Sequence, residues 1–305
     1  MPKHRLSATV LRMIEKFLDY LCSERNYSPR TIESYRSDLE AFEKYFEMLD
    51  CQLSWETIDS DVVRGWMEHM MDGGNTASTV NRRLSALRSL YRFGLIRNMV
   101  KRNPAHLIKG PKKAKLLPQF VRESDMDRLL DGEGMWNGTF EDMRARTILM
   151  MFYETGIRLA ELVSLDDSAV DFVEAQIKVT GKRDKQRIVP FGPELENTLE
   201  AYIKERDAQV KNCCGALFVD DRGRRMTPVK VRTLVRDNLQ KVTTMKKRSP
   251  HVLRHSFATA MLNNDAGLES VQKLLGHESL ATTEIYTHTT FEQLKKVYNK
   301  AHPRA

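Results

Sequence analysis

Two side chains that could bind and protonate a phosphate begin a helical pattern in the last quarter of the chain. His251 and Arg254 lie three residues apart, which places them on one face of a helix. The preceding Ser249-Pro250 predicts where this helix begins, with serine as the N-cap and proline at the first helical position. His255 follows Arg254 directly, and we expect it to point elsewhere on the helix, away from the candidate site.

Further groups that could act as acid, base or nucleophile follow closely. After a break at 263–267, a second short helix is predicted over about 268–275, and Gly276 is typical of a helix C-cap. His277 comes next, and Tyr286 stands nine residues beyond it. A tyrosine hydroxyl can attack phosphorus, and a histidine can transfer a proton or contact a phosphate oxygen.

An arginine also follows a helix-breaking glycine in the middle of the chain, in the run TGIRLAEL at 155–162. Apolar neighbours surround Arg158, so its guanidinium group is expected to be partly desolvated. An unpaired buried charge is costly, so this group must meet a carboxylate or a phosphate. From the residues alone, a salt bridge to Glu161 and a phosphate-binding role are equally good interpretations.

Residues 170–191 change to strand character. Apolar residues alternate from 170 to 179, and a second strand contains Ile188-Val189-Pro190, which predicts a hairpin with its loop at 180–187. The loop is dense in cations. Such a loop by itself indicates a soluble, charged surface more often than a functional site.

These motifs in combination resemble the tyrosine recombinase family, and specifically its Xer-like branch. The resemblance is carried by H-x-x-R at 251–254, by LLGH at 274–277 and by the tyrosine nine residues on, and it covers nearly the whole chain. It implies six catalytic residues in family order, namely Arg158, Lys182, His251, Arg254, His277 and Tyr286. The lysine would be carried on a mobile β-hairpin, although Arg183 stands where the family commonly has glycine.

Each of these residue types suits one part of a DNA strand transfer. Tyr286 would be the nucleophile and form a covalent intermediate. Arg158 and Arg254 would bind the non-bridging phosphate oxygens, where negative charge builds up. Lys182 would be the general acid toward the 5′ oxygen, and the two histidines would transfer a proton or contact the phosphate, with their separate roles left open. The scheme requires no metal or other cofactor, and no tight acidic cluster is seen that would hold magnesium.

The elements that must position these groups divide into two domains. Residues 1–108 are predicted to be all helical, because apolar residues recur at helical spacing within 11–21 and 32–46, and further helices are expected near 60–71 and 76–93. The resemblance implies that this is a four-helix, SAM-like core-binding domain that clamps one side of a DNA duplex.

A proline-rich and lysine-rich linker is predicted at 109–118, followed by a second domain over 119–305. The expected fold is mainly α with a small β-sheet or hairpin, and the resemblance implies an α+β catalytic domain. A short strand is expected at 217–219 and an amphipathic terminal helix at 290–302. In the resembled family such a helix packs on a neighbouring protomer, whereas the alternative is packing on its own chain.

Two rows of cations are candidates for contacting DNA. The helix at 76–93 and the helix expected at 227–242 each have a basic face. A solvated face is the ordinary explanation of such a row, but the resemblance favours phosphate and groove contacts. The residues predicted to bind DNA are Arg82, Arg83, Arg88, Lys230, Arg232 and Arg236.

The composition sets limits on the class of protein. The chain has 305 residues, a net charge of +8 and a pI near 9.2, which permits nucleic-acid binding without proving it. The four cysteines lack metal-ligand spacing, which fits a reducing compartment without structural zinc. No stretch is long and apolar enough to span a membrane, and the first residues lack a signal core, so we expect a cytoplasmic protein.

The resemblance implies a site-specific recombinase that cuts and rejoins double-stranded DNA through a 3′-phosphotyrosine and a Holliday junction. It would act as a homo- or hetero-tetramer with a second recombinase, possibly under a DNA translocase. The compact length favours chromosome dimer resolution at cell division over a phage, transposon or integron integrase. The alternatives from other classes are a type IB topoisomerase-like enzyme and a catalytically silent DNA-binding protein.

Overall fold

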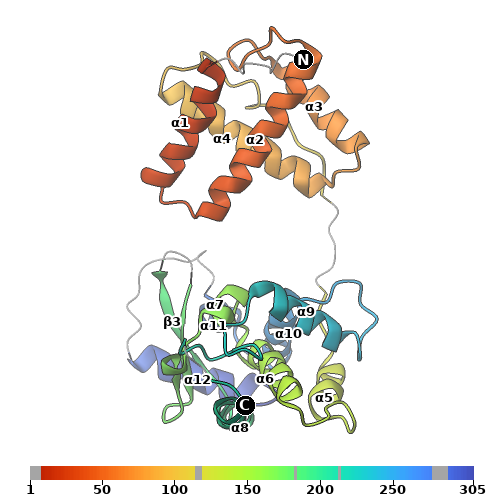
Figure 1. The fold of residues 1–305 in the computed structure, drawn as a ribbon, viewed down its shortest axis with the longest axis vertical. Helices are drawn as coiled ribbons and strands as arrows, with labels where there is room; N and C mark the ends of the chain where they lie inside the picture. Colours follow the sequence, from red (N-terminus) through yellow and green to blue (C-terminus); the bar gives the residue numbers. More distant parts are fainter. Residues whose placement is uncertain (1–7, 114–118, 182–183, 212–213, 277–287) are drawn as a thin grey trace. The chain divides into compact units, whose positions relative to one another are not determined.

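A computed structural model describes residues 8–113, 119–181, 184–211, 214–276 and 288–305. The chain divides into two compact units, Met1–Leu116 and Leu117–Ala305 (Figure 1). Each unit has its own hydrophobic core. Both units are mainly helical, and the second contains a small antiparallel sheet, which confirms the predicted fold class. Within the described ranges, no helix combines the length and the apolar character needed to cross a membrane.

The first unit consists of four helices, as predicted. They are α1 (Ala8–Ser23), α2 (Pro29–Leu49), α3 (Ser60–Asp72) and α4 (Ala77–Ile96). Ser28 caps α2 by accepting a hydrogen bond from the Thr31 amide at 3.3 Å. Thr76 caps α4 in the same way, and α4 continues three residues beyond the predicted end. The caps satisfy backbone donors that a helix leaves free at its start.

Aromatic side chains fill the centre of this first core. The rings of Phe42 and Trp66 have their centroids 4.7 Å apart, and the ring of Trp55 lies 5.6 Å from that of Phe42. These side chains come from α2, α3 and the segment between them, so their burial fixes how the helices pack. Burying side chains of this size contributes strongly to the stability of a small helical unit.

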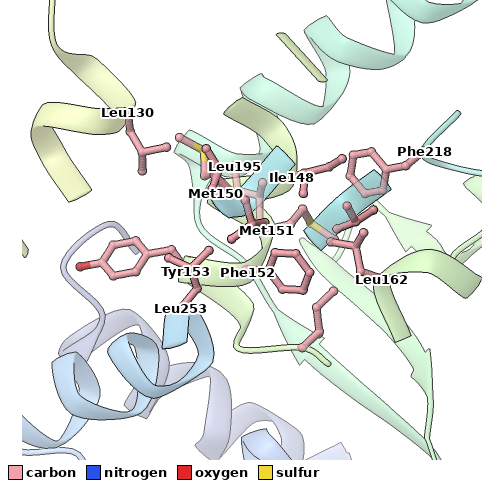
Figure 2. Packing of buried hydrophobic residues seen from close by; sticks show 14 of the residues in the cluster. Leu130, Ile148, Met150, Met151, Phe152, Tyr153, Leu162, Leu195, Phe218 and Leu253 are labelled. Carbon is pink, nitrogen blue, oxygen red and sulfur yellow. The ribbon is translucent and has the colours of Figure 1, made fainter. Parts of the chain in front are cut away.

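The second unit is built around α6 (Phe140–Thr155), which is buried on all sides from Thr147 to Thr155. It packs against α5 (Glu123–Asp131), α8 (Pro193–Gln209), α9 (Pro228–Leu239) and α10 (Pro250–Asn263). Figure 2 shows Met150, Met151 and Phe152 of α6 among side chains from the surrounding elements. A helix that is buried all round is expected only at the centre of a core.

The sheet of the second unit differs from the expected hairpin. Its strands are β1 (Val170–Asp171), β2 (Gln176–Thr180) and β3 (Gln186–Pro190), in that order and antiparallel. The continuous strand predicted over 170–179 is wrong, because the chain turns between β1 and β2, with Ala175 at a φ of 47°. The strand predicted at 217–219 is also wrong, since only isolated bridges form, at Ala216 and Val219.

Two short helices complete the framework of the site. The helix α7 (Leu159–Ser164) follows α6, and α11 (Leu268–Leu275) follows α10. The predicted start of α10, with Ser249 at the N-cap and Pro250 at the first position, is confirmed. The predicted second helix and its glycine cap are also confirmed, because α11 ends at Leu275 and Gly276 adopts the left-handed conformation at φ 65°.

The terminal helix α12 (His288–Ala301) packs on its own unit. Leu294 and Tyr298 are buried in a cluster with Phe257 of α10 and Leu274 of α11. This is the alternative that the sequence left open. Packing against a neighbouring protomer stays a prediction, because a single chain is described.

Candidate active site

The first arginine of the site is positioned by the break between α6 and α7. Gly156 ends α6 at a φ of 58°, and a Cβ atom there would lie 2.5 Å from Cδ1 of Phe257. A glycine is therefore required both by the backbone conformation and by the close approach of α10. The turn that it permits sets Arg158 at the N-cap of α7, next to the helix that carries His251 and Arg254.

Glu161 holds this arginine in place. Its carboxylate accepts hydrogen bonds from the Arg158 backbone amide at 2.7 Å and from Arg158 Nη1 at 2.8 Å. The same carboxylate takes a two-point ion pair from Arg187 of β3, at 2.7 Å and 2.9 Å. Burial would raise the pKa of Glu161, but the hydrogen bonds and charges of Arg187 and Arg158 outweigh it and lower the pKa to about 2.

The second arginine has a different environment. Arg254 is buried, with 7% of the residue exposed, and its guanidinium group donates to the carbonyls of Gly156 at 2.6 Å and Leu275 at 2.7 Å. Within the described part of the chain, no carboxylate lies at ion-pair distance from it. Burial and the nearby positive charges of Arg158 and Arg187 lower the pKa of Arg254 to about 10, so it remains a cation at neutral pH.

Three consecutive carbonyls at the end of α11 each receive one arginine. Arg187 Nε donates to Leu274 O at 3.0 Å, and Arg254 Nη2 donates to Leu275 O. Arg158 Nη2 donates to Gly276 O at 2.9 Å. The end of a helix leaves its last carbonyls free and carries a partial negative charge, so it attracts cations. The C-terminus of α11 thus gathers arginines from three distant parts of the sequence.

The resulting cluster has an excess of positive charge. Among the described residues, three guanidinium groups surround the single carboxylate of Glu161. Arg158 keeps 42% of its side chain exposed, so the cluster is accessible from solvent. A buried cation without a counter-charge is costly, and an anion that enters the site removes this cost. The geometry is therefore that of an anion site suited to a phosphate.

His251 lies on the same helix as Arg254, but its nearest described partner is unexpected. Its Nε2 is 3.1 Å from Nε2 of His255, and the two rings lie in edge contact. Our expectation that His255 points elsewhere is wrong, because residues four apart share a helix face. Burial, then His255, Lys247 and Arg254 lower the pKa of His251, which favours a neutral imidazole that can accept a proton.

The structure describes three of the six predicted catalytic residues. It brings Arg158 and Arg254 together at the end of α11, and His251 lies one turn from Arg254 on α10 with its residue exposed. Lys182, His277 and Tyr286 lie outside the described residues. Gly181 and Gly276, which precede Lys182 and His277 in the sequence, border the cluster: a Cβ atom on either would lie 3.3 to 4.0 Å from Arg187 Nη1. Within the described ranges, no group of three or more His, Cys, Asp or Glu could hold a metal ion.

The predicted DNA-binding arginines of α4 are partly engaged within their own unit. Arg82 and Arg83 both pair with the buried carboxylate of Asp38, although half of the Arg82 side chain is exposed. Arg88 donates from Nε to Ala105 O at 2.9 Å and from Nη2 to Ile108 O, so it fastens the segment after α4. Their contacts with DNA stay a prediction, and of the three Arg82 has the largest exposed surface for it.

The cations of α9 are exposed. Lys230 pairs with Asp220 at 2.7 Å, and Arg236 pairs with its neighbour Asp237 at 2.8 Å. Arg232 is exposed, and no ion pair to it is found in the described ranges. Lys230 and Arg236 could exchange these partners for phosphate oxygens, and Arg232 could bind one directly, so the role of all three in DNA binding also stays a prediction.

Arg187 is a residue of the site that the sequence does not reveal, because its position predicts a place in the cation-dense loop. The structure places it in β3 with 8% of the residue exposed. The signal was present in the strand period, because residues 187 and 189 share the face that Val189 buries. What the sequence could not show was that this face lies against Glu161 and α11.

Comparison with known proteins places the chain in a family. The model described as "Phage integrase family" matches residues 119–293, and "Phage integrase, N-terminal SAM-like domain" matches residues 14–98. The Tyrosine recombinase XerC of Pelotomaculum thermopropionicum is 39% identical, over 96% of this chain and 98% of the relative. The Tyrosine recombinase XerD of Oceanobacillus iheyensis is 36% identical, over the same shares.

Solved structures show the same fold. The XerH site-specific recombinase in a post-cleavage complex with a palindromic difH substrate has a TM-score of 0.76 at 22% identity, over 97% of this chain and 98% of that one. A lambda integrase dimer bound to a COC′ core site has a TM-score of 0.68 at 15% identity, over 91% and 99%. The chain belongs to the phage integrase family and is a tyrosine site-specific recombinase of the Xer type.

Proposed function

We propose that this chain cuts DNA at the phosphate that binds in the arginine cluster and rejoins the strand to a partner duplex. The observation that carries this proposal is the excess of positive charge around Glu161, with Arg254 buried and donating, among the described residues, to carbonyl oxygens alone. A phosphodiester gains negative charge on its non-bridging oxygens in the transition state, and fixed guanidinium groups stabilise that charge. Membership of the tyrosine recombinase family supports the same chemistry.

The order of events follows from what each residue can do. Tyr286 attacks phosphorus and forms a 3′-phosphotyrosine while the 5′ oxygen leaves with a proton from Lys182. Arg158 and Arg254 hold the non-bridging oxygens, and His251 accepts or donates a proton beside them. The free 5′ hydroxyl of the partner duplex then attacks the phosphotyrosine, which restores a phosphodiester. Exchange of one strand pair makes a Holliday junction, and exchange of the second resolves it.

We further propose that the substrate is a chromosomal dimer-resolution site. Relatives named XerC and XerD match this chain over 95–99% of their own length, and XerH is bound to a difH substrate in its structure. The acting assembly is a tetramer on two sites, with this chain alone or with a second recombinase, in the cytoplasm, where a DNA translocase could control it. A mobile-element integrase is the second candidate, because a transposon integrase shares the fold at a TM-score of 0.73.

Trapping of the covalent intermediate tests the proposal. A nicked duplex with a candidate dimer-resolution sequence from the same chromosome loses, after cleavage, the short fragment that carries the new 5′ hydroxyl. The attacking hydroxyl is then gone, so the protein stays attached to the DNA. We expect a shifted band on a denaturing gel that forms in EDTA and is absent for Tyr286→Phe. Binding without any adduct, also after addition of the second recombinase of the host, would support a silent DNA-binding protein. Relaxation of supercoiled DNA without a two-site product would support a type IB topoisomerase-like enzyme.

A further inference from the structure

We propose that Arg187 is a positioning residue for strand cleavage that acts through Glu161 on Arg158. This inference rests on the proposed function, because it assigns a role in that reaction to a residue that would not itself touch the DNA. Arg187 lies in β3, outside the six residues that the family resemblance implies. Its side chain is 7% exposed, so it is enclosed by protein and is not a surface cation of the hairpin loop.

Arg187 binds both carboxylate oxygens of Glu161 that hold Arg158. Its two terminal nitrogens bind the two oxygens of Glu161, at 2.7 Å and 2.9 Å. Those same two oxygens accept from Arg158, one from Nη1 and the other from the backbone amide. A planar guanidinium group is suited to a carboxylate in this two-point geometry, which leaves the carboxylate a single orientation. The orientation of Arg158 is therefore set by Arg187.

The remaining nitrogen of Arg187 extends this control to α11. Nε donates to Leu274 O, and Cδ, Nε and Nη1 of Arg187 lie 3.1 to 3.3 Å from where a Cβ of Gly276 would be. Gly276 O is the other acceptor of Arg158. Arg187 thus touches both groups, Glu161 and the end of α11, between which the Arg158 guanidinium is held.

The register of the sheet adds a second link. Val179 pairs with Arg187 and Thr180 pairs with Gln186, so Arg187 stands near the loop end of the two paired strands. Gly181 follows, and a Cβ atom on it would lie 3.4 Å from Glu161 Oε1. The ion pair therefore fastens the strands of the hairpin to α7, which is what a residue that aligns separate parts of a site must do.

The chain provides a matched control in Arg206. This arginine is also buried, pairs at two points with the carboxylate of Asp167 at 2.6 Å and 3.0 Å, and donates to the carbonyls of Ala216 and Leu217. Among its described contacts, none is with Glu161, Arg158 or α11. Substitutions of Arg206 therefore remove a buried arginine with a two-point ion pair, whose carboxylate partner is 41% exposed, without touching the arrangement around Arg158.

The experiment measures single-turnover formation of the covalent adduct on the nicked duplex, with the full chain at a temperature where circular dichroism shows each variant folded. For Arg187→Met we expect cleavage to slow by about 10²-fold, the size of effect that small misplacements produce, while DNA affinity changes little. Arg187→Lys should recover only part of the rate, because an ammonium group cannot bind both carboxylate oxygens at once. Arg206→Met should cleave within about 3-fold of the unsubstituted chain, as expected for a site with no shared partners.

A double-mutant cycle with Arg158→Ala separates positioning from a general loss of stability. Because the trapped adduct accumulates irreversibly, slow reactions are followed over hours. If Arg187 acts through Arg158, Arg187→Met adds little further loss once Arg158 is removed. Equal further losses with and without Arg158, or equal effects of Arg187→Met and Arg206→Met, would overturn the inference. Failure of the unsubstituted chain to form an adduct would instead count against the proposed function.

Discussion

The two units each contain a buried carboxylate flanked by two arginines, but they use it differently. In the first unit Asp38 pairs with Arg82 and Arg83, whose side chains are 50% and 24% exposed. In the second unit Glu161 pairs with Arg158 and with the buried Arg187, and a third, buried arginine lies beside them. Water can solvate the surplus charge of the first group. The surplus positive charge of the second group is largely buried in protein, so it favours the binding of an anionic ligand.

This difference in burial explains why two arginine-rich groups are suited to different roles, one to DNA binding and the other to catalysis. An exposed cation contributes to DNA binding through phosphate neutralisation, and it can be replaced with a moderate loss. A buried cation with no carboxylate partner destabilises the free protein. The same cation strongly stabilises a transition state in which negative charge develops beside it. The second unit accepts this cost at the point where the reaction is proposed to occur.

The largest effect is expected for Arg254→Ala. Removal of this guanidinium group should reduce single-turnover cleavage by about 10³-fold, as for the loss of one preorganised donor to a transition-state oxyanion. Denaturant unfolding should show a smaller effect than cleavage does, because the loss of an uncompensated buried charge is offset by two carbonyls that lose their donor. Near-normal cleavage by this variant would contradict the difference drawn between the two arginine groups.

The two carboxylates should differ in stability when each is neutralised. Glu161→Gln leaves Arg187 buried without a counter-charge, so we expect the free energy of unfolding to fall by about 3 kcal/mol or more. Asp38→Asn leaves arginines that water can reach, and a loss of about 1 kcal/mol is expected. Urea unfolding of both variants under the same conditions measures the two losses. Equal losses would contradict the proposed difference between the two carboxylates.

Acid should destabilise the second unit through His302. Burial, most of all, lowers the pKa of His302 from 6.5 to about 4, although a hydrogen bond to the Tyr153 carbonyl opposes the shift. The unfolded chain therefore binds a proton more readily than the folded chain does. The contribution of neutral His302 to the free energy of unfolding is complete above about pH 6.5 and is lost as the pH falls toward 4. The difference between the two pKa values corresponds to a change of about 3 kcal/mol at most in the free energy of unfolding.

The measurement is urea unfolding at pH 7 and pH 5 for the unsubstituted chain and for His302→Phe. The variant should lose much less stability between the two pH values. An unchanged pH dependence in His302→Phe would assign the acid sensitivity to other groups.

The smallest effects are expected along α9. Arg232→Ala should weaken DNA binding about evenly across sequences and lower the salt slope by about 1, as for the loss of one phosphate contact. Lys230→Ala should have a smaller effect, because Lys230 must first leave Asp220. Fluorescence anisotropy titrations over a range of salt concentrations measure both, and the reverse order would count against α9 as a phosphate-contacting face.

Much of the framework could be predicted from local signals. Ser28-Pro29 and Ser249-Pro250 mark helix starts, and Gly156 and Gly276 mark helix ends, because caps depend on neighbouring residues. The fold class and the gathering of Arg158 near Arg254 also followed from sequence, the latter through a family resemblance.

The errors arose where tertiary contacts decide the outcome. Arg187 carries a charge, so a surface position was the ordinary expectation, whereas burial against Glu161 and Leu274 depends on segments far away in the sequence. His255 was excluded although its spacing from His251 places both on one helix face. The break after β1 depends on a left-handed Ala175, for which the residue type offers no signal.

Cleavage of a neutral analogue tests most directly whether the buried surplus charge serves the scissile phosphate. The nicked duplex is prepared with a methylphosphonate at the cleavage position, which lacks one negative oxygen, and is compared with the natural duplex. We predict that the deficit of Arg254→Ala, about 10³-fold on the natural phosphate, shrinks to a small factor on the neutral one. The same deficit on both substrates would contradict the account, because Arg254 would then act without regard to the charge of the phosphate.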